Sequence, residues 1–258
     1  MELTPLKKKQ INIDKLIPVI SIGMVLAIWE LFVIISKVPT YVLPRFSKVI
    51  VTLFENRELL VLHSKYTVSE ALIGIVISIF IAITVALIMD QFKFAKKLLY
   101  PIIAISQTIP LMAIAPLFII WFGFDMLPKV LVVILVCFFP MTINIMTGFE
   151  EIDQDKIDLF KVMKSSKFDL YRKLKIPSAI PYFFSGLKIA TTYAILAALI
   201  GEFMGGKYGL GLYLEAARRS YSIESVFAII IVVISITLIL LGIIQLIERR
   251  VLKYKGEF

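Results

Sequence analysis

Polar side chains set inside long apolar runs are the residues of this chain whose types could do chemistry. A hydroxyl or amide group in such a setting either bonds to a neighbouring helix or lines a path along which a polar solute moves. Pro101, Pro110 and Pro116 are expected to break one of these runs, because proline cannot donate a helical hydrogen bond. We predict a translocation path, with helix packing as the alternative, for Ser106, Gln107, Thr108, Thr142, Asn144, Thr191 and Thr192.

Glu202 is an acidic residue at the end of another of these runs. Acids inside apolar runs mark functional sites by default, because an unpaired charge is costly in a membrane. Two interpretations stay open. We favour a structural ion pair with Lys207 or Arg218, and the alternative is a place near the mouth of the translocation path.

The sequence lacks the residues that most enzymes and metal sites need. A single histidine, His63, excludes a His-x-x-x-His zinc site, and a single cysteine, Cys137, excludes a thiolate cluster or an internal disulfide. No Gly-x-x-x-x-Gly-Lys-Ser/Thr motif occurs, and Gly205-Gly206-Lys207 lacks its spacing. We therefore expect no enzymatic activity, no metal and no cofactor on this chain, and no ATP site.

The runs that carry these groups are predicted to be membrane helices. Of the 258 residues, 59% are hydrophobic and 18% are charged, whereas soluble domains have about 45–50% and roughly 25%. A bilayer is spanned by roughly 20 apolar residues in a helix. The sequence predicts an all-α bundle with six transmembrane helices: Leu16–Ser36, Thr67–Met89, Leu98–Phe122, Val130–Gly148, Tyr182–Met204 and Val226–Ile247.

Basic residues between the runs predict the orientation of the chain. The N-terminus, the second and fourth connections and the C-terminus hold 18 of the 28 Lys and Arg residues, against 9 in the other connections. Because cytoplasmic connections are enriched in Lys and Arg, both termini are expected in the cytoplasm. The net charge of +9 is assigned to this orientation and not to nucleic acid. The first run exceeds the roughly 7–15 apolar residues of a signal peptide and is expected to remain.

The chain divides into two predicted cytoplasmic tails, residues 1–15 and 248–258, and a transmembrane domain, residues 16–247. Within the domain, Tyr41–Leu62 mixes charged and apolar residues and is predicted to be an amphipathic helix on the outer surface. Residues 149–181 form a cytoplasmic connection far longer than the usual 2–8 residues. A connection of that length predicts a surface that meets another protein.

The long connection is predicted to contain two short helices. The first runs from Gln154 to Met163, and Asp153 or Asp155 can cap its N-terminus. The second starts at Ser166, which forms a capping box with Asp169, and ends at Pro177. Each helix has an apolar face that either packs beneath the spans or docks into a partner. The two faces are Ile157, Phe160 and Met163, and Phe168, Tyr171 and Leu174.

The same connection resembles the EAA loop of permease subunits of bacterial ABC importers. That loop has the pattern Glu-Ala-Ala, three residues, Gly, nine residues, Ile-x-Leu-Pro. The spacing is kept here by Asp158-Leu159-Phe160, Lys164 and Leu174-Lys175-Ile176-Pro177. The similarity extends over nearly the whole chain and is greatest to the nitrate/sulfonate/taurine branch, which includes permeases for thiamine-pyrimidine precursors and riboflavin. Further motifs in the same order include Leu43-Pro44, Trp121-Phe122-Gly123, Gly201-Glu202-Phe203-Met204-Gly205, Gly209-Leu210-Gly211 and Glu248-Arg249-Arg250.

The resemblance implies a type I permease fold in the bacterial inner membrane and import of a small solute by alternating access. It implies four partners besides lipid: a second permease copy, two ABC ATPase subunits that hold ATP and magnesium, and an extracytoplasmic solute-binding protein. A stand-alone secondary transporter or channel is the alternative, although no charge relay or repeat is visible. Residues implied to couple the ATPase are Asp155, Ile157, Asp158, Phe160, Lys161, Met163, Lys164, Phe168 and Pro177.

Three positions depart from the loop pattern. Asp158 has a shorter side chain than the glutamate of the pattern, and Leu159 and Phe160 have larger side chains than its two alanines. Lys164 replaces a glycine that would supply a left-handed turn, and a non-glycine residue there costs roughly 1 kcal/mol. We expect either a remodelled turn or a strained Lys164.

Overall fold

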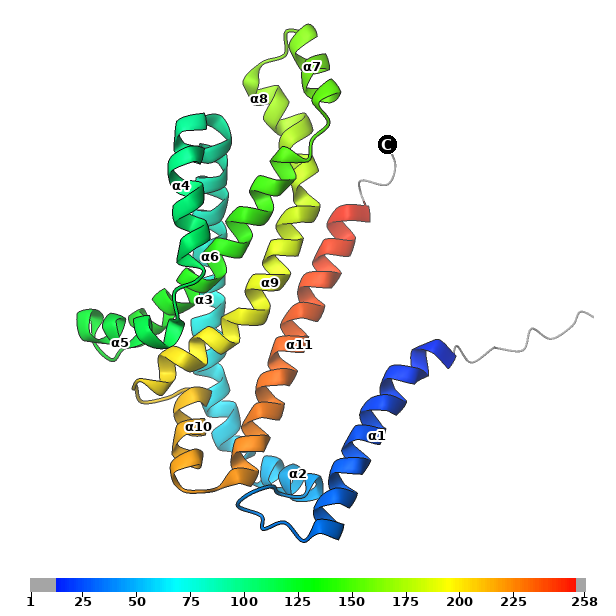
Figure 1. Ribbon diagram of the computed structural model, residues 1–258, viewed down its shortest axis with the longest axis vertical. Coiled ribbons are helices and arrows are strands. Elements are labelled where there is room, and N and C mark those ends of the chain that lie inside the picture. The colour runs from blue at the N-terminus through cyan, green and yellow to red at the C-terminus, as the bar shows by residue number, and fades with distance from the viewer. Residues whose placement is uncertain (1–12, 254–258) are drawn as a thin grey trace, which may run out of the picture.

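The computed structural model describes residues 13–253 and contains helices and no strands in that range (Figure 1). The predicted all-α fold is confirmed. The helices are α1 (Ile13–Ser36), α2 (Phe46–Glu55), α3 (Arg57–Gln91), α4 (Lys93–Ser106), α5 (Leu111–Phe122), α6 (Met126–Glu150), α7 (Gln154–Val162), α8 (Lys167–Leu170), α9 (Ile176–Phe203), α10 (Leu210–Arg219) and α11 (Ile223–Lys253), with a π-helical segment, η1 (Tyr171–Lys175), before α9.

Each of the six predicted apolar runs falls on a helix or a helix pair. Four helical stretches are long and apolar enough to cross a membrane by themselves: α3, α6, α11 and the stretch Lys167–Phe203 that contains α9. α1 contributes a shorter apolar stretch, Ile20–Ser36, and α4 and α5 qualify only as a pair. The chain is therefore a multi-pass membrane protein.

The third run, predicted as one span from Leu98 to Phe122, is instead a sharply bent pair of helices. α4 and α5 meet at 102°. α4 ends at Ser106, because Pro110 has no amide to continue the helical bonding to that turn, and α5 begins directly after the proline. Pro101 and Pro116 were also expected to break the run, but they lie inside α4 and α5. Membrane helices accommodate internal prolines because neighbouring groups satisfy the freed backbone atoms.

Helices α3, α6 and α9 form the centre of the molecule (Figure 1). α6 and α9 approach closely where glycine removes a side chain: a Cβ on Gly186 would lie 3.0 Å from Met141 Cα. Small residues allow such backbone-to-backbone packing in membranes. Along α9 the contact continues through buried alanines, Ala190, Ala194, Ala197 and Ala198.

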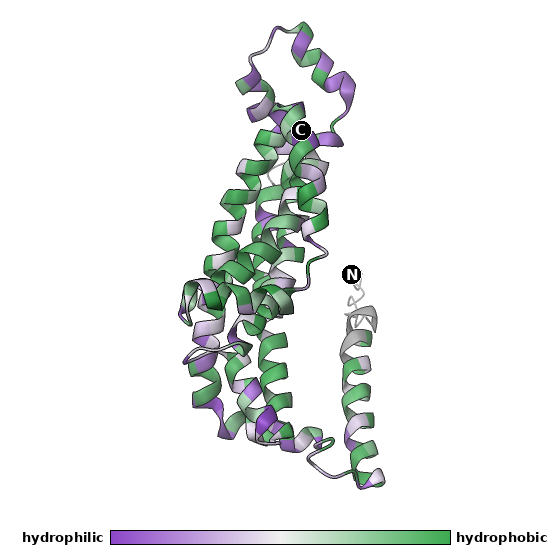
Figure 2. Ribbon diagram, turned by 60° about the vertical axis from the view of Figure 1, so that its left-hand side comes forward, coloured by the Kyte–Doolittle hydropathy of each residue, from purple (hydrophilic) through white to green (hydrophobic). Residues whose placement is uncertain are grey.

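Helix α1 stands apart from the bundle and joins it through α2 at one end (Figures 1 and 2). Glu30 of α1 accepts hydrogen bonds from the hydroxyl and amide of Ser47 at the start of α2, at 2.8 and 3.1 Å. Trp29 packs between Phe46 and Phe227. The predicted surface helix Tyr41–Leu62 is shorter than expected, because the chain turns at Asn56 and the residues from 57 onward begin α3.

Ion pairs join the helices at the end of the molecule that carries α7 and α8. Lys175 bonds Asp90 of α3 at 2.6 Å, and Lys188 bonds Glu248 of α11 at 2.9 Å. The C-terminal tail predicted from residue 248 is helical as far as Lys253, and residues 254–258 lie outside the described range. Of the N-terminal tail predicted for residues 1–15, residues 1–12 lie outside it as well.

Candidate translocation and coupling sites

The bend between α4 and α5 opens a hollow of about 490 Å³ against α6 and α9, here named the kink hollow. Ser106 and Gln107 contribute polar groups from the bend, and Tyr193 contributes its ring and hydroxyl from α9. The Ser106 hydroxyl donates to the carbonyl of Ile103 at 2.8 Å, and Gln107 is exposed. The ten lining residues are Ser106, Gln107, Ile109, Leu111, Leu135, Val136, Phe139, Pro140, Ile189 and Tyr193.

The other hydroxyl and amide groups predicted for the path lie outside this lining. Thr108 is exposed and donates to the carbonyl of Ile105 at 2.7 Å. Thr142 is buried and donates to Phe138 O, while Asn144 donates to Pro140 O, which belongs to a lining residue. Thr191 is buried and its hydroxyl has no hydrogen-bond partner among residues 13–253, and Thr192 is exposed. The structure thus brings Ser106 and Gln107 together and disperses the rest.

Glu202 does not form the ion pair with Lys207 or Arg218 that the sequence favoured. Its side chain is fully buried and accepts hydrogen bonds from the Thr67 hydroxyl at 2.6 Å and the Gly211 amide at 2.5 Å. Arg218 instead bonds Glu215 on its own helix. The pairing prediction was wrong because Thr67 lies 135 residues away in the sequence, on α3.

Three side chains from other helices cap the start of α10. A helix leaves its first amides without internal partners. Here His63 Nδ1 accepts from the Gly209 amide at 3.0 Å, Thr67 Oγ1 from the Leu210 amide at 2.8 Å, and Glu202 from Gly211. The cap residue, Gly209, has a φ of +134°, which favours glycine. Through these contacts Glu202 fixes α10 to α3 and α9. Nearby, Lys129 pairs with Glu70 at 3.3 Å, and both side chains are buried.

The first helix of the long connection, α7, begins and ends with local motifs. Asp153 accepts the Asp155 amide at 3.0 Å, so Asp153 is the predicted cap. At the other end, the Ser165 amide bonds the Phe160 carbonyl at 3.0 Å across Lys164, which has a φ of +51°. This is the left-handed helix ending that usually uses glycine. Lys164 therefore takes the glycine conformation, and the turn is not remodelled.

The acidic position of the loop pattern makes local contacts within α7. Asp158 accepts hydrogen bonds from Lys161 Nζ at 2.7 Å and from Gln154 at 3.1 Å. The Lys161 ammonium lowers the pKa of the Asp158 carboxyl below its ordinary value. Asp158 consequently stays ionised at neutral pH and presents its charge on an exposed helix.

The second helix of the connection continues further than the sequence predicts. Ser166 caps it by accepting the Asp169 amide at 3.1 Å, and its hydroxyl donates to the Asp169 carboxylate at 2.7 Å. Pro177 was predicted to end this helix, but helical structure runs through it from Lys167 to Phe203. The π-helical segment η1 directly precedes Pro177, and the Ile176 amide bonds the Tyr171 carbonyl five residues back, so the helix widens at the proline and does not end.

The face that the α7–α8 hairpin, residues 154–175, leaves uncovered differs from the predicted stripe. Leu159, Val162, Met163 and Phe168 are 57%, 80%, 67% and 70% exposed. Ile157 and Phe160 are half-buried, as are Tyr171 and Leu174. The face of α7 with Ile157 and Phe160 is partly covered, as expected where it packs beneath the spans, and the neighbouring face with Leu159 and Val162 is exposed. Leu159 and Val162 are exposed apolar residues that neither predicted face contained.

Replacing Lys164 by glycine is expected to stabilise the end of α7. The substitution removes the roughly 1 kcal/mol that a side chain costs at positive φ. Hydrogen-exchange mass spectrometry on the purified chain should show about fivefold greater protection of residues 154–166. The control, Lys156→Gly inside α7, should reduce protection by a similar factor. Unchanged exchange in Lys164→Gly would show that the turn carries no strain.

These features define a class of protein: a multi-pass helical membrane protein with a bent helix pair beside its central helices and a projecting hairpin. Residues 74–253 match the family described as the binding-protein-dependent transport system inner membrane component, and the chain belongs to that family. The resemblance found in the sequence is thereby confirmed.

Several curated relatives match almost the whole chain. A probable ABC transporter permease protein of Haemophilus influenzae is 33% identical over 86% of this chain and 91% of its own length. The formylaminopyrimidine transport permease protein ThiX of Halalkalibacterium halodurans is 31% identical over 93% and 96%. The riboflavin transport system permease protein RibX of Chloroflexus aurantiacus is 29% identical over 92% and 90%.

Proposed function

We propose that this chain is the membrane-spanning subunit of an ATP-driven importer in the bacterial inner membrane. It works with a second copy of itself, two ATPase subunits that hold ATP and magnesium, and an extracytoplasmic solute-binding protein. Movement of the ATPases displaces the α7–α8 hairpin, and the bundle alternates between two states that expose the passage on opposite sides. Family membership supports this role.

The uncovered apolar face of the hairpin is the observation that carries the proposal. Four large apolar side chains project from a segment that stands clear of the bundle (Figure 1). Burying one such side chain contributes roughly 1.5–3 kcal/mol, so a groove on a partner would bind this face well. The ion pair of Lys175 with Asp90 anchors the base of the hairpin to α3. Displacement of the hairpin by a partner would therefore be transmitted to the membrane-spanning helices.

The distribution of charge supports a cytoplasmic position for the hairpin and for both termini. The hairpin, the connection between α3 and α4, and the end of α11 lie at the same end of the molecule (Figure 1). These three segments, counted to the C-terminus, hold 14 of the 28 Lys and Arg residues, which favours the cytoplasmic side.

The lining of the kink hollow favours a neutral solute. Its ten lining residues are uncharged and offer hydroxyl and amide groups beside aromatic and aliphatic walls. Such a lining suits a heteroaromatic solute of the pyrimidine or flavin kind better than a sulfonate or nitrate, whose charge it would leave unpaired. The solute-binding protein would make the main selection. Binding of candidate pyrimidines, flavins, sulfonates and nitrate to that protein tests the assignment.

Replacing Val162 by aspartate is expected to release the ATPase from the purified complex. A carboxylate buried in an apolar groove costs several kcal/mol, enough to reduce co-purification at least about tenfold. Phe160→Asp should act similarly. Val42→Asp is the matched control, because Val42 is exposed at the opposite end. Retention of the ATPase by both hairpin variants would contradict the proposal. Solute uptake by the purified chain without ATPase would favour a stand-alone transporter.

A further inference from the structure

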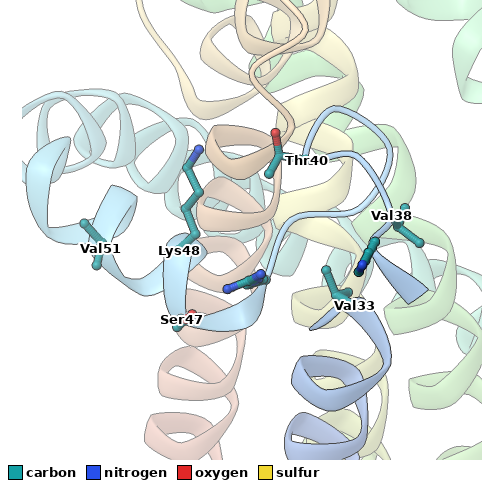
Figure 3. A pocket seen from close by; sticks show the side chains of 8 residues that line it. Val33, Val38, Thr40, Ser47, Lys48 and Val51 are labelled. Atoms are coloured by element: carbon teal, nitrogen blue, oxygen red, sulfur yellow. The ribbon is translucent and has the colours of Figure 1, made fainter. Parts of the chain in front are cut away.

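A second hollow lies far from the kink hollow, where the end of α1 turns into α2. It has a volume of about 610 Å³ and is here named the α1–α2 hollow (Figure 3). Its lining combines three basic residues, two hydroxyl residues and three valines. They are Lys37, Arg45, Lys48, Thr40, Ser47, Val33, Val38 and Val51.

The positive charge of this hollow is largely unneutralised. Within the described residues, no acid lies in salt-bridge distance of Lys37, Arg45 or Lys48. Glu30 attracts Arg45 at longer range, but its carboxylate is already occupied by two hydrogen bonds from Ser47. Three cationic side chains and one carboxylate, which is already hydrogen-bonded, leave the hollow with a net positive charge. Like charges that face one hollow repel each other, so an anion bound among them would be stabilised.

The hydroxyl groups and the backbone geometry complete an anion-binding arrangement. Lys48 and Thr40 lie on facing sides of the hollow (Figure 3). Lys37 sits at the end of α1 with a φ of +50°, and the turn from Pro39 to Leu43 brings Arg45 back beside it. The amide of Ser47 is already bonded to Glu30, so the basic side chains and the Thr40 hydroxyl provide the donors.

The hollow adjoins an apolar surface, as a binding site for a lipid would. α1 presents apolar side chains on nearly all sides, among them Ile28, Phe32 and Ile35, which are 59%, 54% and 75% exposed (Figure 2). In a bilayer, acyl chains must cover them. Val38 and Val51 extend this apolar surface to the rim of the cationic hollow. An amphiphile with an anionic head and apolar tails matches both parts.

We propose that the α1–α2 hollow binds the phosphate headgroup of an anionic phospholipid, whose acyl chains lie along α1. The bound lipid fills the angle between α1 and the bundle and fixes α1 to α2. The segment 37–65 holds five of the nine basic residues on the side where Lys and Arg are sparse, and three of the five line this hollow. The preference of Lys and Arg for cytoplasmic connections would not by itself place basic residues on this side of the membrane.

Fluorescence quenching in lipid nanodiscs tests the proposal. In a Trp121→Phe background Trp29 of α1 is the only tryptophan, and it packs on Phe46 at the start of α2. Phosphatidylglycerol and phosphatidylcholine with brominated acyl chains would be compared as quenchers. Each basic residue near a lipid surface contributes about 1 kcal/mol, so a preference of roughly 10–100-fold for phosphatidylglycerol is expected.

The decisive variant is Lys37→Gln/Arg45→Gln/Lys48→Gln, which should lose most of this preference. Arg57→Gln/Lys65→Gln/Lys207→Gln removes the same charge from exposed positions elsewhere and should keep it. Lys37→Arg/Lys48→Arg should also keep it, which separates loss of charge from loss of fold. Native mass spectrometry of the intact assembly should show one phosphatidylglycerol fewer per permease copy in the first variant.

Three results would overturn the proposal. The first is an equal preference in the hollow variant and its charge-matched control. The second is full relief of quenching by inorganic phosphate at millimolar concentration, which would identify a site for free anions. The third is unchanged lipid preference together with lost capture of the solute-binding protein, which would identify a protein-docking patch.

Discussion

Replacing Glu202 by alanine is expected to lower the free energy of unfolding by roughly 3–5 kcal/mol, because two buried hydrogen-bond donors lose their acceptor at about 1–3 kcal/mol each. Thr67 would lose the acceptor at 2.6 Å, and the Gly211 amide the acceptor at 2.5 Å. The Gly211 amide has no room to find water, since this part of α10 is buried. Thermal unfolding in detergent should begin about 10 °C lower in the variant.

The matched control is Glu215→Ala on α10, the helix whose start Glu202 caps. Glu215 pairs with Arg218 and Arg219, whose side chains are mostly exposed, and such surface pairs contribute about 0–1 kcal/mol. Glu202→Gln should fall between the two, since the amide keeps one acceptor oxygen and replaces the other with a donor. Equal shifts for Glu202→Ala and Glu215→Ala would show that the buried contacts do not hold α10 in place.

The contrast between Asp153 and Glu202 shows what the sequence could predict. Asp153 and Ser166 cap helices through amides two or three residues away, and local spacing was sufficient to find both. Lys164 takes the left-handed turn because the helix must end there, and this too is a local signal. Glu202 on α9 meets residues on two other helices, α3 and α10, so only the packed fold determines its partners.

Hydropathy predicted where helices lie but not how they bend. An apolar run of 25 residues and a pair of helices at 102° have the same composition, and only Pro110 marked the difference. The sequence predicted the same break at Pro101 and Pro116, but both residues lie inside helices that continue through them. The π-helical segment before Pro177 shows the same limit, because the packed structure rather than the residue decided whether the helix ended.

The bend has a direct consequence for the translocation path, which thiol labelling can measure. In a Cys137→Ser background, Gln107→Cys is expected to react rapidly with a charged, water-soluble thiol reagent. Gln107 lines the kink hollow and is exposed. Thr142→Cys should react at least about 100-fold more slowly, because Thr142 is fully buried and labelling would require local opening that costs roughly 3 kcal/mol.

Exposure alone does not distinguish a water-filled path from a lipid-facing surface, so a third position is needed. Leu238 on α11 is 62% exposed among apolar neighbours, and Leu238→Cys should stay unlabelled in a bilayer. A thiol reacts as the thiolate, which forms in water and not in hydrocarbon. Labelling of Gln107→Cys should change when ATP is trapped on the complex, since alternating access moves the water boundary. Equal labelling at positions 107 and 238 would place the bend against lipid and remove it from the path.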